Sequence, residues 1–322
     1  MKASRIRLSS IDALRGLAVI LMFFHHFPEF LMQDPYNSDT FILMFMISRL
    51  AAPLFLTVVG ISMVLSAYNR SRGEDKNATV RHFIKRGFTL LIAGAVLNVM
   101  IFADPMKLNI LHTIGLSIII LSIVAVSPTM YNIAASLLAA LLCSEAAYFL
   151  EPAKTILSRF DFPLFPWIIF VIYGMILGSS IIQFNKEGKL TITVWHLQVS
   201  AVLLMVSTAF CIFIGIPFEY QHKITLPFIS LAMALTAYIL SISLLVYEIR
   251  RSDPAILRPL LTYGRFALPV YFIHYAFVIT IPRIQGFENM LSLNESLYAL
   301  VVFLIASYLV LRKIERSRRP FP

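Results

Sequence analysis

One stretch near the N-terminus carries side chains that could bind an anion and move a proton. Arg15 and His26 are separated by ten residues, almost all of them apolar. In a helix, eleven steps make about three turns and about 16 Å, so the two side chains lie on nearby faces at different depths. His25 points about 100° away from His26. Asp12 precedes Arg15 by three residues, a spacing at which the two can pair. The pattern predicts His26 as a proton acceptor on the same helix as the cation Arg15.

Three other apolar segments carry polar groups at a comparable depth, and these are Arg49, His112 and His274. Ionisable side chains are costly inside lipid and usually face a cavity or a polar partner. Each one alone could be a satisfied hydrogen bond between helices. Because four separate segments place such groups at a similar depth, we expect one polar chamber. Its candidate catalytic residues are His26, Arg15, His274 and His112.

A second group of residues is basic and flanks the apolar segments. Arg81, Lys85 and Arg86 open one segment, and Arg265 opens another. Such residues anchor topology in many membrane proteins. They also suit a polyphosphate, because arginine forms strong charge-assisted bonds and a helix N-terminus favours anions. We assign these four residues, together with Asp12, to the binding of a phosphorylated cofactor.

Other chemistries fit the sequence less well. It contains no HExxH motif and no two histidines four residues apart, so we expect no metal. It also lacks the GxSxG motif of serine esterases.

The composition requires lipid as part of the solvent. Charged residues make up 14% of the 322 residues, against about 25% in soluble domains. Apolar residues make up 59%, and the mean hydropathy is +0.81. A membrane span needs about 20 apolar residues. We therefore predict an all-α, polytopic membrane protein with a single domain, residues 1–322. Its ten expected spans are 11–33, 41–68, 82–103, 108–126, 128–150, 163–183, 193–216, 225–248, 262–282 and 291–311.

Orientation follows from the basic residues, which accumulate on the cytosolic side of membrane proteins. The N-terminus and the connections on its side carry twenty of them, whereas the opposite connections carry five: Lys107, Lys154, Arg159, Lys223 and Arg283. Both termini are therefore predicted to be cytosolic. The net charge of +10 reflects this topology, and we expect no nucleic-acid partner.

These features resemble a known superfamily, the transmembrane acyltransferases related to acyltransferase-3. Arg15 and His26 match its Arg-X10-His motif. Within it, the sequence is most similar to the heparan-α-glucosaminide N-acetyltransferase-like branch. The similar blocks are Ile11 to Ala18 with Met22 and His26, Ala52 to Ser62, Ile110 to Gly115, Phe162 to Trp167, and Gly264-Arg265 to Tyr271 and His274.

The resemblance implies an enzyme that takes an acyl group, usually acetyl, from cytosolic acetyl-CoA. It delivers this group to a sugar or glycoconjugate on the other side of the membrane. The phosphates of CoA suit Arg81, Lys85, Arg86 and Arg265, and a neutral imidazole can deprotonate the acceptor. The lysosomal branch has a luminal histidine after the first helix, but no histidine occurs here between His26 and His82. We therefore favour direct transfer with His26 as the base.

Two points stay open at this stage. A transporter or flippase with a polar chamber is the alternative function, and it predicts solute flux without CoA. Either a monomer or a homodimer is compatible with the sequence. The expected partners are acetyl-CoA, a carbohydrate acceptor and membrane lipid, and the expected location is a bacterial inner membrane.

Overall fold

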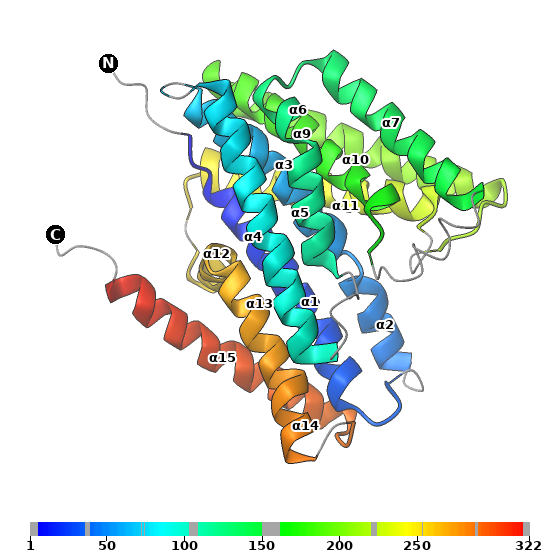
Figure 1. Cartoon of the computed structure of the whole chain (residues 1–322), viewed down its shortest axis with the longest axis vertical. Coiled ribbons are helices and arrows are strands. Elements are labelled where there is room, and N and C mark those ends of the chain that lie inside the picture. The colour runs from blue at the N-terminus through cyan, green and yellow to red at the C-terminus, as the bar shows by residue number, and fades with distance from the viewer. Residues whose placement is uncertain are drawn as a thin grey trace. The chain divides into compact units, whose positions relative to one another are not determined.

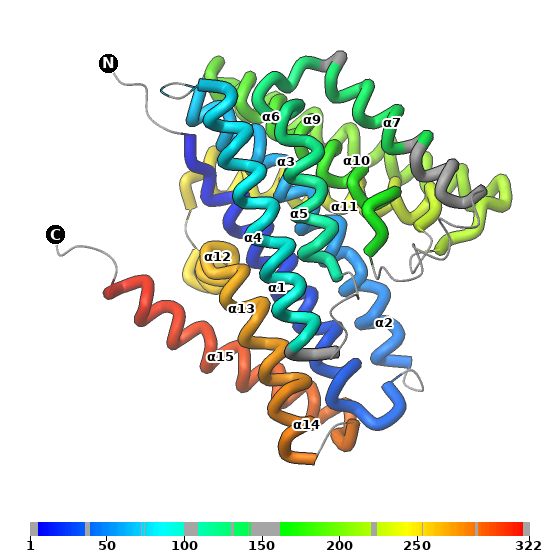
Figure 2. The backbone as a smooth tube through the Cα atoms, in the orientation of Figure 1, coloured from blue at the N-terminus to red at the C-terminus, as the bar shows by residue number. Residues whose placement is uncertain are grey.

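The computed structural model describes residues 6–35, 39–71, 73, 75–102, 109–149, 162–219, 224–252, 254–286 and 289–317, and Figure 2 follows the backbone through them. Within these ranges the regular elements are helices, and one isolated β-bridge pairs Met32 with Leu291. The all-α prediction is confirmed for this part of the chain. Two compact units are present: a larger unit of residues 1–8 and 56–250, and a smaller unit of residues 9–55 and 251–322. The prediction of a single domain stays a prediction.

The smaller unit is assembled around the first helix. That helix packs against five others from both ends of the chain, because its buried face runs along its whole length. In Figure 1 the C-terminal helices follow one another in yellow, orange and red. The elements are α1 (Ser9–Leu31), α2 (Asp39–Ser48), the start of α3 (Ala51–Arg70), η3 (Ala255–Leu257), α12 (Arg258–Arg265), α13 (Ala267–Tyr275), η4 (Ala276–Thr280), α14 (Ile281–Gln285) and α15 (Leu293–Ser317).

The larger unit contains the middle of the chain. Helices that are close in sequence pair with each other: α4 with α5, which run side by side in Figure 1, and α10 with α11, while α9 contacts both α5 and α7. The elements after α3 are α4 (Lys76–Phe102), α5 (Ile110–Ile120), α6 (Ser122–Val126), α7 (Met130–Phe149), α9 (Leu164–Lys186), α10 (Leu190–Phe213), α11 (Leu226–Leu244) and η2 (Leu245–Ile249).

Within the described residues, each of the ten predicted spans contains helix, and seven helical segments are long and apolar enough to cross a membrane. These seven are 9–31, 39–70, 164–186, 190–213, 226–249, 267–285 and 293–317. The fourth predicted span is divided at Leu121, where α5 ends and α6 begins. Four of the five basic residues assigned to the outer side, Lys107, Lys154, Arg159 and Lys223, lie outside the described residues. The orientation of the termini and the count of ten stay predictions.

Apolar side chains cover the outer face of α10. Val199, Val202, Leu203 and Val206 are more than half exposed and recur every three or four residues. Such a stripe on a soluble protein would be an unusually large apolar patch, whereas lipid solvates it without cost. The exposed stripe therefore fits an integral membrane protein.

The second predicted span is not continuous. We expected Arg49 to lie about eight residues inside a helix, but it occupies a turn between α2 and α3. Its backbone N–H donates to the Phe45 carbonyl, and the Leu50 N–H donates to the Ile47 carbonyl. The bond between Leu50 and Ile47 spans three residues rather than four, so the helix tightens and breaks at this point.

Two glycines let α1 and α12 cross at backbone distance. A Cβ atom on Gly16 would lie 1.9 Å from the Leu260 carbonyl oxygen, and one on Gly264 would lie 1.8 Å from the Asp12 carbonyl oxygen. Because no side chain fits between the backbones, the two helices approach as closely as small-residue motifs allow in membranes. The crossing brings Arg15 of α1 next to the end of α12.

Candidate active site

Two histidines from opposite ends of the chain meet in the smaller unit. The Nδ1 atom of His26, on α1, lies 2.9 Å from Nε2 of His274, on α13. Their rings are nearly parallel, with an interplanar angle of 11°. His274 is fully buried, and His26 is half-buried. The structure thus brings together two of the predicted catalytic residues, and His26 is the less buried of the two.

Aromatic rings fix the orientation of this pair. The Tyr275 ring lies 5.0 Å from the His26 ring and 4.2 Å from the His274 ring, while Phe23 lies 5.0 Å from His274. Tyr271 packs edge-on against His274 at 5.4 Å. Directly after Tyr275 the helix widens into the π-helical turn η4, a feature that often accompanies functional sites. The imidazoles are therefore held in one geometry before any substrate binds.

The surroundings of His274 favour one arrangement of protons. Its Nδ1 atom has no hydrogen bond of ordinary geometry, and the backbone groups nearest to it belong to Val270 and Tyr271 of its own helix. In the tautomer with the proton of His274 on Nδ1, Nε2 of His274 accepts the hydrogen from Nδ1 of His26. That tautomer leaves the lone pair of His26 on Nε2, where it can act as a base.

A second pair, which the sequence analysis missed, lies on the same helix. The Nε2 atom of His25 lies 3.1 Å from a carboxylate oxygen of Glu29, one turn further along α1. The side chains are 14% and 26% exposed, so both are mostly buried. The spacing of four residues was the available signal, because histidine and glutamate at that spacing share a helix face.

The His25 ring contacts a residue of the neighbouring helix α2. It lies 4.7 Å from the ring of Phe45 on α2, and the guanidinium carbon of Arg49 lies 4.0 Å from the centroid of the same Phe45 ring. Arg49 also interacts electrostatically with His26 and Glu29. A cation, a carboxylate and three imidazoles therefore gather at the C-terminal half of α1.

Three of these residues could in principle hold a metal. The nearest ligand atoms of His25, His26 and Glu29 all lie within 4.8 Å of one another. However, Nε2 of His25 already contacts the Glu29 carboxylate, and the positive charge of Arg49 interacts with both His26 and Glu29. The donor set therefore fits an ion pair better than a metal site.

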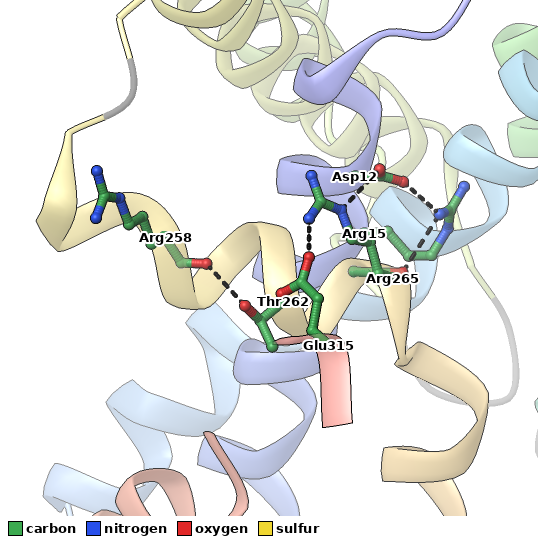
Figure 3. A network of polar contacts seen from close by, with 7 residues as sticks. Asp12, Arg15, Arg258, Thr262, Arg265 and Glu315 are labelled. Atoms are coloured by element: carbon green, nitrogen blue, oxygen red, sulfur yellow. Dashed lines mark hydrogen bonds and ion pairs between the residues drawn. The ribbon is translucent and has the colours of Figure 1, made fainter. Parts of the chain in front are cut away.

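At the N-terminal end of α1, positively and negatively charged side chains pair with each other. A guanidinium nitrogen of Arg15 donates to Asp12 at 3.0 Å and to the Gly264 carbonyl at 3.3 Å. Arg265 lies 3.7 Å from Asp12 and donates to Glu315 on α15. Figure 3 shows the four side chains together around α12. Arg15 and Arg265, predicted to serve catalysis and phosphate binding, thus already share two carboxylates.

The remaining predicted residues lie in the larger unit. His112 is buried at the start of α5, where its Nδ1 accepts a hydrogen bond from the Asn109 backbone at 3.3 Å. The Asn109 side chain accepts from the Leu111 N–H at 2.9 Å and also from the backbone of His112, and the bond with His112 completes a capping box. Gly94 makes room for the His112 ring. A local structural role accounts for these contacts.

Arg81, Lys85 and Arg86 are exposed on the first turns of α4. Arg70, at the end of α3, lies 3.3 Å from both ring nitrogens of His82, so these helix ends are neighbours. The same end of α3 lines a pocket of about 510 Å³, together with Ala125, Val126, Pro128 and the end of α9. In it, the Lys186 ammonium lies 4.3 Å from the Tyr68 ring centroid, and Gln183 and Ser71 add polar groups. An aromatic ring, amide and hydroxyl groups and nearby cations suit a nucleotide.

Comparison with known proteins identifies the family of the chain. No curated protein matches the chain. The family described as heparan-alpha-glucosaminide N-acetyltransferase, catalytic, matches residues 7–214, which is more than half of the chain. The match contains His25, His26 and Glu29 and ends before His274 and Arg265. The chain belongs to the heparan-α-glucosaminide N-acetyltransferase catalytic family.

Proposed function

We propose that this membrane acetyltransferase moves an acetyl group from cytosolic acetyl-CoA to a hydroxyl or amine of a carbohydrate on the extracytoplasmic side, with His26 as the general base. The family supports acetyl transfer. The observation that carries the role of His26 is its hydrogen bond to a fully buried histidine, while His26 itself is only half-buried. A base needs both an oriented ring and access to its substrate.

The proposed reaction takes two steps. Nε2 of His26 removes a proton from the acceptor while its oxygen or nitrogen attacks the thioester carbonyl carbon. The resulting tetrahedral intermediate collapses, the carbon–sulfur bond breaks, and the thiolate of CoA takes the proton back from His26. The products are the acetylated acceptor and the CoA thiol. His274 acts as a positioning residue, because it holds His26 by the hydrogen bond at Nδ1.

For the donor, we propose that its phosphates bind to Arg81, Lys85 and Arg86. The adenine end then lies in the neighbouring pocket against Tyr68 and Gln183. Arg265 is a poorer phosphate ligand than the sequence suggested, since Asp12 and Glu315 already neutralise it. We therefore give Asp12, Arg15 and Arg265 a structural role at the crossing of α1 and α12.

The test is a transfer assay with detergent-purified protein, acetyl-CoA and glucosamine. Free CoA thiol and the acetylated product are both measured. Replacing a general base typically costs about 10²- to 10⁴-fold in rate, so His26→Ala should lose transfer while it still binds acetyl-CoA. His196→Ala is the matched control, because His196 is an exposed histidine on α10. Near-normal turnover by His26→Ala would refute its assignment as the base.

The same assay addresses transport. A transporter would move solute across proteoliposomes without CoA and would release no CoA thiol. Transfer that depends on acetyl-CoA and disappears in His26→Ala would favour the enzyme.

A further inference from the structure

Glu29 has no part in the reaction so far, although its place in the smaller unit is unusual. A carboxylate that is mostly buried in an apolar helix needs a reason to be there, because such groups are expensive inside a membrane. Its nearest oxygen lies within 4.8 Å of a ring nitrogen of His26, and its direct partner is His25 at 3.1 Å. Glu29 thus lies beside the proposed base and is held there by a second histidine.

The reaction creates a charge at this point. When His26 takes a proton from the acceptor, its ring becomes an imidazolium. Its partner His274 is neutral and fully buried, so it offers no counter-charge. The other charged groups that face His26 are His25, when protonated, and Arg49, and both oppose a positive ring. Among the described groups that interact with His26, Glu29 supplies the negative charge.

We propose that Glu29 is a positioning residue for the transferase. It stabilises the imidazolium that forms on His26, and His25 fixes its carboxylate at the required distance. This inference rests on the proposed function, because it needs His26 to act as the base. It follows the logic by which a carboxylate next to a catalytic histidine stabilises the charged ring in hydrolytic triads. Here, the carboxylate acts across space rather than by a direct hydrogen bond, since its partner is His25.

The geometry also gives His25 a role, which is to hold the Glu29 carboxylate in place. Its Nε2 binds Glu29, and its ring packs between those of His26 and Phe45. Loss of this ring would leave the carboxylate free to turn away from His26. The effect of removing His25 should therefore resemble that of Glu29 and be smaller.

The experiment compares kcat and KM in two acceptors. Glu29→Gln keeps the shape and removes the charge. With acetyl-CoA and glucosamine, it should lower kcat about 10- to 100-fold, while KM for acetyl-CoA stays within about twofold. Hydroxylamine attacks thioesters without help from a base, so with this acceptor Glu29→Gln should approach the wild-type rate. Glu219→Gln, the same change at an exposed site in the other unit, is the control.

Each outcome is informative. An unchanged kcat in Glu29→Gln, with an active wild type, overturns the role of Glu29 and leaves the proposed function intact. An equal loss with glucosamine and hydroxylamine, or a parallel loss of acetyl-CoA affinity, means that Glu29 only maintains structure. A stoichiometric metal in the purified protein that disappears in His25→Ala overturns the ion pair. A wild type that transfers no acetyl group to either acceptor refutes both proposals.

Discussion

The two ends of α1 carry similar numbers of ionisable groups but use them differently. At the N-terminal end, Arg15 and Arg265 share the carboxylates of Asp12 and Glu315, so positive and negative charges balance. At the C-terminal end, two imidazoles bond to each other, and Glu29 pairs with a third. A balanced network needs no ligand. Two neutral imidazoles that share one hydrogen bond still have a free lone pair, which can accept a proton. We therefore assign a structural role to the N-terminal end of α1 and a catalytic role to its C-terminal end.

Replacing His274 is the strongest test of the catalytic role assigned to the C-terminal end of α1. His274→Ala should lower kcat about 10²-fold or more, because His26 loses the partner that sets its proton and its ring plane. Acetyl-CoA affinity should stay close to that of the wild type. Steady-state kinetics with glucosamine measure the effect, and His196→Ala again serves as the control. If His274→Ala keeps its kcat, the imidazole pair is only a satisfied contact between helices.

The opposite end should respond in stability rather than in rate. Gly264→Val places methyl groups where the Asp12 carbonyl already lies, so α1 and α12 must separate. Overpacking of this kind costs about 1–3 kcal/mol or more, and we expect a lower melting temperature and a lower yield. Arg15→Ala should also lower the melting temperature, by less, while kcat of the folded fraction is retained. A loss of kcat in Arg15→Ala at unchanged stability would return Arg15 to the catalytic group.

The basic residues of α4 provide a test of the donor site in the larger unit. A charge-assisted hydrogen bond contributes about 1.5–3 kcal/mol, so Arg81→Ala should weaken acetyl-CoA binding about tenfold or more. Isothermal titration in detergent, with Lys189→Ala as an exposed lysine control, measures the change. If Arg81→Ala and the double variant with Lys85→Ala bind acetyl-CoA normally, these residues serve topology alone.

Contacts that depend on helical spacing could be predicted from the sequence. Helical spacing placed Arg15 and His26 on one helix, and similar depth predicted one chamber for His26, Arg49, His112 and His274. Of these, His274 contacts His26 and Arg49 belongs to the same unit, whereas His112 belongs to the larger unit. The pairing of Asp12 with Arg15 also followed from spacing.

The contacts that were not predicted from the sequence involve distant segments or breaks within helices. Glu315 lies fifty residues beyond Arg265, and nothing local connects the two. The turn at Arg49 did have a local signal, because Pro53, four residues later, has no N–H to donate to the Arg49 carbonyl. The contact between His25 and Glu29 could have been predicted, because residues four apart lie on the same face of a helix.

The smallest expected effect concerns His112, whose predicted catalytic role has a structural competitor. Its Nδ1 accepts the Asn109 N–H, so His112→Ala should unpair one buried donor and weaken the cap of α5 by about 0.5–2 kcal/mol. His112→Gln can still reach the same N–H, because glutamine is a usual residue at this position of a capping box. Thermal unfolding should therefore show a lower midpoint for His112→Ala and a smaller change for His112→Gln, with kcat near that of the wild type in both. If both variants melt normally and lose turnover, His112 belongs with His26 among the reacting groups, and the assignment of chemistry to one end of α1 is incomplete.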